Sequence, residues 1–197
     1  MNSFGVVDSF EESVAKFAGS RYAVAVNTGT SALFLSFKYE KLKHPEIETV
    51  TMPCRTFVSV PMAAIHAGFK VDFVDYEWNG VYMIDPISVT DGALRFKRGM
   101  YNGGLHCLSF HARKLLNIGE GGMVLTNDHD AYHWLRKARY SGRSAPLYDI
   151  EHIDMVGWQL YMTPEKAARG LHLMDYVENW EDQQMEYTDL RTAKVFQ

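Results

Sequence analysis

The side chains best suited to chemistry lie in residues 109–124, which read SFHARKLLNIGEGGMV. Lys114 follows an apolar run that is typical of a strand, and it stands between Ser109 and a glycine-rich turn at residues 119–122. A lysine amine can form an imine with a carbonyl compound, which is how enzymes use this side chain in covalent catalysis. An isolated lysine is usually an exposed surface residue, so the catalytic interpretation depends on the neighbouring motifs.

A second motif, NTGTS at residues 27–31, follows an apolar run at 22–26 and precedes a helical pattern at 32–41. A strand, a small polar turn and a helix N-terminus in this order present free backbone N–H groups and the positive end of a helix dipole. Both features suit a phosphate group. A Gly-Thr-Ser turn is also an ordinary helix cap, and this alternative stays open on this segment alone.

Asp91 is the acidic residue that completes the set, because it directly follows a short strand-like run at residues 87–90. Pyridoxal phosphate (PLP) needs an amine for its imine, a corner for its phosphate and an acid that keeps its pyridine nitrogen protonated. Lys114, residues 27–31 and Asp91 supply these three groups, although Asp91 could instead be a turn residue before Gly92. The sequence therefore predicts a PLP-binding protein with Lys114 as the Schiff-base lysine.

The lysine segment resembles the motif S-F-H-x-x-K-x-x-x-x-G-E-G-G of the DegT/DnrJ/StrS family of sugar aminotransferases, with no gap in the spacing. Further blocks resemble the family in the same order and extend over about residues 9 to 190; they lie at 23–33, 53–59, 67–75 and 157–163. The resemblance implies a PLP-dependent enzyme of polysaccharide biosynthesis. It would transfer an amino group from an amino acid such as glutamate to a nucleotide-linked keto sugar.

Position by position, the resemblance implies roles for single residues. Lys114 would be the Schiff-base lysine and would carry the proton in the 1,3-shift, and Asp91 would pair with the pyridine nitrogen. Phe57 would stack on the cofactor ring. The phosphate would be held by Thr30, Ser31 and Ser109, and by Gln159 from the partner subunit, which implies a homodimer with shared active sites.

The chain departs from the family pattern in length and at particular positions. Family members are usually close to twice as long, and after the residue that matches Asp75 they carry a strand–helix unit that the short stretch to Ile87 cannot hold. The small C-terminal domain of the family is also expected to be lacking. Leu94 replaces a glutamine or histidine, Gln159 an asparagine and Tyr161 a basic residue.

These departures keep two other functions open. One is a catalytically degenerate homologue that binds PLP or a partner chain and has a structural or regulatory role. The other is a different PLP reaction, such as dehydration or racemisation. An intact arrangement of Lys114 and Asp91 beside an open cleft favours the aminotransferase, whereas a cleft closed by re-paired strands favours the degenerate homologue.

The elements that position these residues alternate along the chain. Strands are expected at 22–26, 49–52, 71–75, 87–90, 105–110 and 122–126, and helices at 10–17 (capped by Ser9), 32–41, 58–67, 129–140 and from 163 past 173. This order predicts an α/β fold with a mostly parallel sheet and flanking helices, whose ligands bind at the carboxyl ends of strands. The resemblance makes it a shortened large domain of the aspartate aminotransferase-like PLP transferases.

We expect a single PLP-binding domain over residues 1–197, with a core at about 9–140 and a helical C-terminal segment at about 141–197. Cys54 and Cys107 indicate no disulfide framework. No stretch has the length and hydrophobicity of a membrane span or a signal peptide, so we expect a cytoplasmic protein. The net charge of −4 argues against a nucleic-acid partner. His106 and Cys107 would point to opposite faces of a strand, so no metal is expected.

Overall fold

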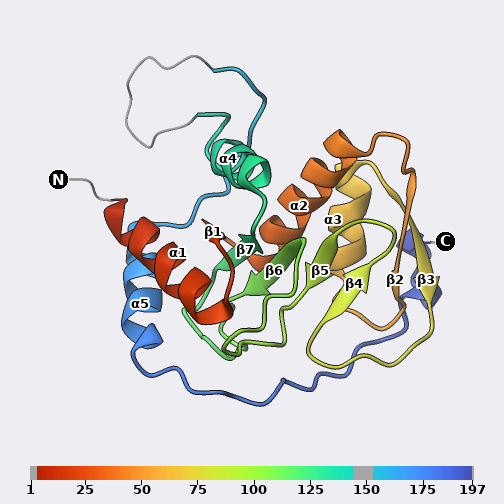
Figure 1. Cartoon of the computed structure of the whole chain (residues 1–197). Coiled ribbons are helices and arrows are strands. Elements are labelled where there is room, and N and C mark those ends of the chain that lie inside the picture. The colour runs from red at the N-terminus through yellow and green to blue at the C-terminus, as the bar shows by residue number, and fades with distance from the viewer. Residues whose placement is uncertain (1–3, 144–152, 197) are drawn as a thin grey trace.

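The computed structural model describes residues 4–143 and 153–196, so residues 1–3, 144–152 and 197 of the predicted domain lie outside the described part. A five-stranded sheet forms the centre (Figure 1), and its strands follow the order β1 (Tyr22–Val26), β7 (Gly122–Thr126), β6 (Leu105–Ser109), β5 (Val89–Asp91) and β4 (Tyr82–Ile84). Next to β4, β2 (Thr49–Pro53) and β3 (Lys70–Val74) form a separate parallel pair.

The sheet is mixed, because β1, β6 and β5 run in one direction and β7 and β4 run in the other. The α/β class with flanking helices is confirmed, but the predicted sheet of mostly parallel strands is not what forms. Two connections, residues 85–88 and 110–121, contain no helix and join antiparallel strands. The connection 85–88 is too short for a parallel return, whereas residues 92–104 also lack a helix and still join the parallel strands β5 and β6. β1, β5 and β6 still end at one edge of the sheet.

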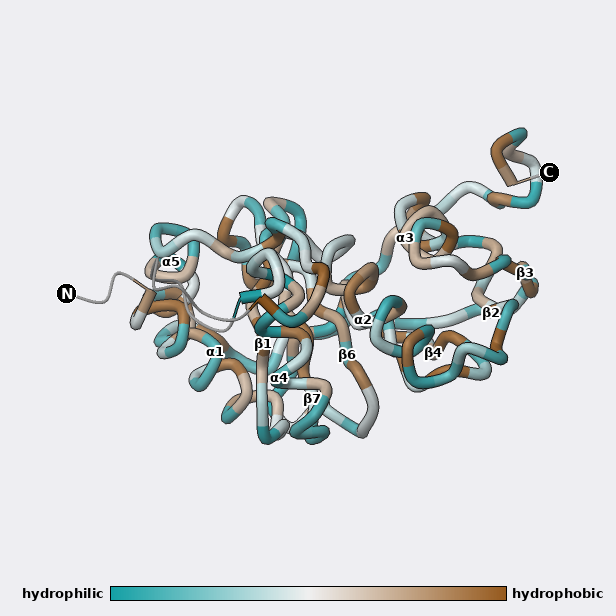
Figure 2. The backbone as a smooth tube through the Cα atoms, turned by 90° about the horizontal axis from the view of Figure 1, so that it is seen from above, coloured by the Kyte–Doolittle hydropathy of each residue, from teal (hydrophilic) through white to brown (hydrophobic). Residues whose placement is uncertain are grey.

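Helices cover both faces of the sheet. α1 (Gly5–Ala18) and α5 (Pro164–Met174) pack on one face, and α2 (Gly29–Lys43), α3 (Ser59–Ala67) and α4 (His129–Ala138) pack on the other. Side chains of β1 alternate between the two cores, because neighbouring residues of a strand point to opposite faces: Ala23 and Ala25 face α1, whereas Val24 and Val26 face α2. Figure 2 shows hydrophobic stretches along α2 and β6 in the middle of the molecule.

α1 begins at Gly5, five residues earlier than predicted. Ser9 lies inside the helix, where its hydroxyl donates to the carbonyl oxygen of Gly5 at 3.1 Å, so the predicted cap at Ser9 is wrong. The apolar stripe explains the earlier start, because Val7 is buried together with Phe10 and Val14 and extends the helical spacing by one turn.

β4 is a strand that the sequence did not predict. It lies in the stretch that is too short for the strand–helix unit of the family, and it pairs antiparallel with β5. On its other side the chain meets β2, where the N–H of Thr51 donates to Asp85 at 2.7 Å and the N–H of Asp85 donates to Thr51 at 3.1 Å. A short antiparallel strand therefore occupies the space between β5 and β2 and leaves neither edge open there.

Beyond Met174 the chain is mostly extended. Residues 175–189, here called the C-terminal strap, run from α5 along the lower edge of the molecule in Figure 1 to the side of β2 and β3. In the described part of this region the only further helical turns are the 3-10 turns Leu190–Thr192 and Lys194–Phe196. None of the helices in residues 4–143 and 153–196 has the length and hydrophobicity needed to cross a membrane.

A buried ion pair joins α1, β1 and the end of α4. Glu11 is 4% exposed and Arg139 is 7% exposed, and the two side chains form a short salt bridge. Glu11 also accepts a hydrogen bond from the N–H of Ala25 at 2.7 Å, and Arg139 donates to the carbonyl oxygen of Ala25. The charges are thus hydrogen-bonded as well as paired, as buried charges must be to remain in a core.

We expect Arg139→Ala to lower the free energy of unfolding by about 3–5 kcal/mol, because it leaves the Glu11 carboxylate buried without its main partner. Urea unfolding measures this loss. The matched control is Lys70→Ala, which removes an exposed pair with Glu48 and should change the stability little. Equal unfolding midpoints for the two variants would show that the buried pair does not stabilise the fold.

Candidate functional site

A cavity of about 440 Å³ lies at the sheet edge where β1, β5 and β6 end. This volume falls in the range of small-molecule sites. Five of the residues singled out in the sequence line it, from four segments of the chain: Thr30, Phe57, Asp91, Ser109 and Lys114. The fold therefore brings together the amine, the acid and the small polar turn that the sequence predicted as one site.

The first turn of α2 faces this cavity. Thr28 caps the helix, because its hydroxyl oxygen accepts from the N–H of Ser31 at 3.0 Å. The N–H groups of Gly29 and Thr30 also belong to the first turn, where a helix offers no acceptor of its own, and both residues line the cavity. A Cβ atom on Gly29 would lie 2.8 Å from the Cβ of Ser109, so only glycine allows this close approach.

Two residues predicted to hold the phosphate lie outside the cavity lining. Ser31 is buried, and its hydroxyl lies 2.8 Å from the hydroxyl of Thr28. Gln159 is exposed, forms a bridge with Tyr140 and accepts a hydrogen bond from Ser141 at 3.2 Å. Ser31 thus supports the helix cap, and the predicted contact of Gln159 with a partner subunit stays a prediction.

Asp91 is 5% exposed and is held by two hydrogen bonds. One carboxylate oxygen accepts from the Tyr82 hydroxyl at 2.8 Å, and the other accepts from the N–H of Ala93 at 2.9 Å. Burial raises the pKa of Asp91, whereas these two donors and the positive charge of Lys114 act in the opposite direction.

Lys114 lies half-buried on the connection between β6 and β7. Burial lowers the pKa of its amine, and the nearby charge of Asp91 partly offsets this effect. The amine contacts the sulfur of Met185 at 3.9 Å. A lowered pKa makes the neutral, nucleophilic amine available closer to neutral pH than for an exposed lysine.

One wall of the cavity consists of residues that carry no motif in the sequence. Trp78 precedes β4, and Met185 and Tyr187 belong to the C-terminal strap. The rings of Trp78 and Tyr187 stack with centroids 6.0 Å apart, and the Phe57 ring meets Tyr187 edge to face at 6.5 Å. Leu94, buried beneath, lines the cavity at the position where the family pattern has a polar residue.

The strap is fixed near its middle by a buried carboxylate. Asp182 accepts from Arg95 at 2.6 to 3.1 Å and pairs with Lys97 at 3.2 Å. Gly80 makes room for it, because a Cβ there would lie 2.3 Å from a carboxylate oxygen of Asp182. The N–H of Gln183 then donates to the carbonyl oxygen of Leu94 at 2.9 Å.

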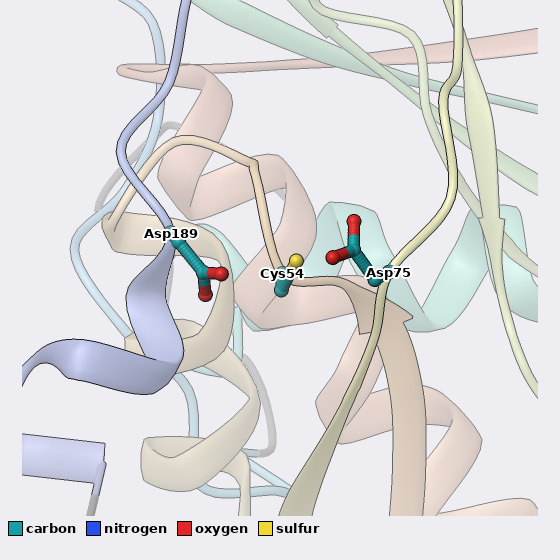
Figure 3. Close-up of side chains that lie close together, drawn as sticks. All are labelled: Cys54, Asp75 and Asp189. Carbon is teal, nitrogen blue, oxygen red and sulfur yellow. The ribbon is translucent and has the colours of Figure 1, made fainter.

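At its end the strap meets a cluster of Cys54, Asp75 and Asp189 (Figure 3), whose possible ligand atoms lie within 4.8 Å of one another. Both carboxylates already pair with guanidinium groups: Asp75 with Arg55 and Arg191, and Asp189 with the same two arginines. Arg191 and Arg55 hold the pKa of Asp189 at about 2. Because two fixed cations occupy this corner, the cluster is an ion-pair network and not a metal centre.

Solved structures of low sequence identity share the fold. Sugar aminotransferase CalS13 from Micromonospora echinospora matches with a TM-score of 0.73 and 21% identity, over 87% of this chain and 61% of that one. The ntda structure from Bacillus subtilis, solved with bound cofactor PMP, matches with a TM-score of 0.70 and 19% identity, over 87% of this chain and 48% of that one. The fold class is that of the PLP-dependent sugar aminotransferases.

The chain belongs to the DegT/DnrJ/EryC1/StrS aminotransferase family, whose model matches residues 3–92 and 97–194. Pyridoxal phosphate is the cofactor of this family. The spore coat polysaccharide biosynthesis protein SpsC of Bacillus subtilis (strain 168) is 27% identical, over 91% of this chain and 59% of its own length. The UDP-4-amino-4,6-dideoxy-N-acetyl-beta-L-altrosamine transaminase of Campylobacter jejuni serotype O:2 is 38% identical, over 88% of this chain and 57% of its own length.

The chain therefore spans less than two thirds of the length of the relatives it matches. The alignments with these two relatives run over 235 and 219 positions, which exceeds the 197 residues of the chain. Each alignment thus contains positions inside the matched region where the relative has a residue and this chain has none. This supports the inference that an internal unit of the family is missing here.

Asp91→Asn should lower the pKa of Lys114, because it removes the negative charge that favours the protonated amine. The test uses protein without added cofactor and an uncharged acylating reagent that reacts with neutral amines. The rate at which this reagent acylates Lys114 should then reach half its maximum at a lower pH than in wild type. Mass spectrometry of the peptide that contains Lys114 measures this rate. Asp130→Asn on the exposed surface of α4 is the matched control. If Asp91→Asn has the same pH midpoint as this control, the charge of Asp91 does not affect the pKa of Lys114.

Proposed function

We propose that this chain binds PLP through Lys114 and acts as an aminotransferase that passes an amino group to a nucleotide-linked keto sugar. The observation that carries the proposal is a single cavity lined by Lys114, Asp91 and the first turn of α2. A half-buried amine, a buried carboxylate and unpaired helix N–H groups are the three features that this cofactor requires. The residues present therefore fit the group.

In this proposal each part of the cofactor has a residue that holds it. The N–H groups of Gly29 and Thr30, with the hydroxyls of Thr30 and Ser109, bind the phosphate at the positive end of the α2 dipole. Asp91 holds the pyridine nitrogen, and Phe57, which is 55% exposed and lines the cavity, covers the ring. When bound, PLP supplies an electron-poor ring that stabilises negative charge on the adjacent carbon.

Lys114 would have a second task after it releases the cofactor, which is to move a proton. The Nζ atom of Lys114, whose pKa is lowered by burial, would accept the proton from the α-carbon of the donor and return it during the transfer. The half-closed cavity beneath Trp78 and Tyr187 limits the access of water to this atom. A base whose pKa is lowered toward the working pH suits this transfer.

The names of relatives support the substrate class. Two of them are transaminases of a UDP-linked amino sugar, and another is the GDP-perosamine synthase of Escherichia coli O157:H7. We propose a nucleotide-linked keto sugar as acceptor and an amino acid such as glutamate as donor. A homodimer with shared sites is part of the proposal, because Gln159 lies exposed and outside the cavity of its own chain.

A second candidate is a PLP-binding homologue without transaminase activity. The observation that favours it is the position of Met185, whose sulfur lies 3.9 Å from the Lys114 amine and occupies space beside it. The apolar Leu94 in the cavity lining also replaces a polar partner for the cofactor. Both functions share the cofactor site and differ in the response to an amino donor.

The absorbance spectrum of the protein with added PLP separates these functions. Wild type should show the band of lysine-bound cofactor, Lys114→Ala should lose it, and Lys16→Ala should keep it as the control for surface lysines. Borohydride reduction and peptide mapping should place the label on Lys114. Bleaching by glutamate supports the aminotransferase, a band that no amino donor changes supports the second candidate, and the absence of a band refutes both.

Gly29→Ala should weaken the binding of PLP by about tenfold or more, because the added Cβ forces the turn away from Ser109 and costs at least one charge-assisted hydrogen bond to phosphate. Binding of pyridoxal, which lacks the phosphate, should change much less. Gly5→Ala is the matched control, since a Cβ there has no neighbour within 4 Å. If PLP and pyridoxal lose affinity equally, the turn does not hold the phosphate.

A further inference from the structure

Tyr82 is a buried residue of β4 whose hydroxyl lies between two other polar side chains. It is 4% exposed, and its oxygen lies 2.8 Å from a carboxylate oxygen of Asp91 and 2.5 Å from the hydroxyl of Thr56. Thr56 itself is 2% exposed. Three polar groups from three segments are therefore enclosed together directly behind the cavity.

The directions of these hydrogen bonds follow from chemistry. An ionised carboxylate can only accept, so the single proton of the Tyr82 hydroxyl must point to Asp91. The proton between Tyr82 and Thr56 must then come from Thr56. The chain of donation thus runs from Thr56 to Tyr82 to Asp91, and it ends on the residue that is proposed to hold the pyridine nitrogen.

We propose that Tyr82, oriented by Thr56, is a positioning residue that keeps the Asp91 carboxylate ionised and directed at the cofactor nitrogen. This proposal rests on the proposed function only for the role of Asp91. Tyr82 lies on the short strand that occupies the place of the unit missing from the family pattern. The replacement strand would thus supply a group to the site as well as cover the sheet.

The surroundings of Asp91 show why such a donor matters. The titratable groups that face it are Tyr82 from β4, Cys107 from β6, Lys114 from the β6–β7 connection and Tyr187 from the strap. Burial raises the pKa of Tyr82, Cys107 and Tyr187, the last to about 12, so all three are neutral near pH 7. Lys114 supplies positive charge, and Tyr82 and the Ala93 N–H supply the hydrogen bonds.

The test is a pH titration of the Asp91 carboxyl by carbon-13 NMR, in protein labelled at the aspartate carboxyl carbons and without cofactor. Asp91→Asn identifies the signal. The Asp91 midpoint should move to higher pH in Tyr82→Phe and by a smaller step in Thr56→Val, which keeps the tyrosine. Tyr101→Phe is the matched control, because its hydroxyl donates to Gly104 and not to Asp91, and it should leave the midpoint unchanged.

A second readout is the affinity for PLP, which should fall about tenfold in Tyr82→Phe through the loss of one hydrogen bond to a charged group. An Asp91 midpoint in Tyr82→Phe equal to that of wild type overturns the proposal. The NMR measurement needs no cofactor, so it separates the two hypotheses. A shifted midpoint in a protein that shows no cofactor band keeps the role of Tyr82 in holding Asp91 ionised and refutes the proposed function.

Discussion

The whole site depends on how closely three backbone segments approach one another at one edge of the sheet. β7 lies between β1 and β6, so the turn after β1 reaches Ser109 at the end of β6 only by crossing the start of β7. That start is Gly122, where a Cβ would lie 2.2 Å from the carbonyl oxygen of Thr28. A Cβ on Gly29 would likewise lie too close to Ser109. Two glycines thus allow the helix terminus and the lysine-bearing connection to border one cavity, since any side chain there would separate them.

Around this fixed corner the rest of the cavity is built from parts that differ from the family pattern. The resemblance to the family implied a missing strand–helix unit after Asp75, and the structure has the short strand β4 at this place. One wall of the cavity comes from Trp78 and the C-terminal strap. The strap holds this position because Asp182, near its middle, is buried against Arg95 and ion pairs involving Asp189 secure its end.

Much of the fold could be predicted from the sequence, and the exceptions have physical causes. The strands at residues 22–26 and 122–126 have the predicted bounds, because each is a buried apolar run that ends in turn residues. β4 was missed because three residues are too few to establish a period, although the buried–exposed–buried pattern of Tyr82, Met83 and Ile84 is that of a strand. The direction of β7 depends on a helix-free connection, whose pairing the local sequence does not specify.

The site could be predicted where a motif placed its residues and not where tertiary contacts did. Lys114, Asp91, Thr30, Ser109 and Phe57 were found from blocks of sequence and do line one cavity. Ser31 was included with its neighbour, but helix geometry turns its hydroxyl back to the cap. Tyr82, Met185 and Tyr187 have no motif, and they reach the site only because β4 pairs with β5 and the strap returns across the molecule.

This arrangement gives the molecule two separable parts. The corner that fits the cofactor is made from helix termini and strand ends. The glycines there leave no room for a side chain. The opposite wall is made from Trp78 before β4 and from Met185 and Tyr187 in the strap, and the close glycine contact of this region, Gly80 against Asp182, lies outside the cavity lining. Substitutions in the strap can therefore reshape the space beside Lys114 while the cofactor corner stays intact.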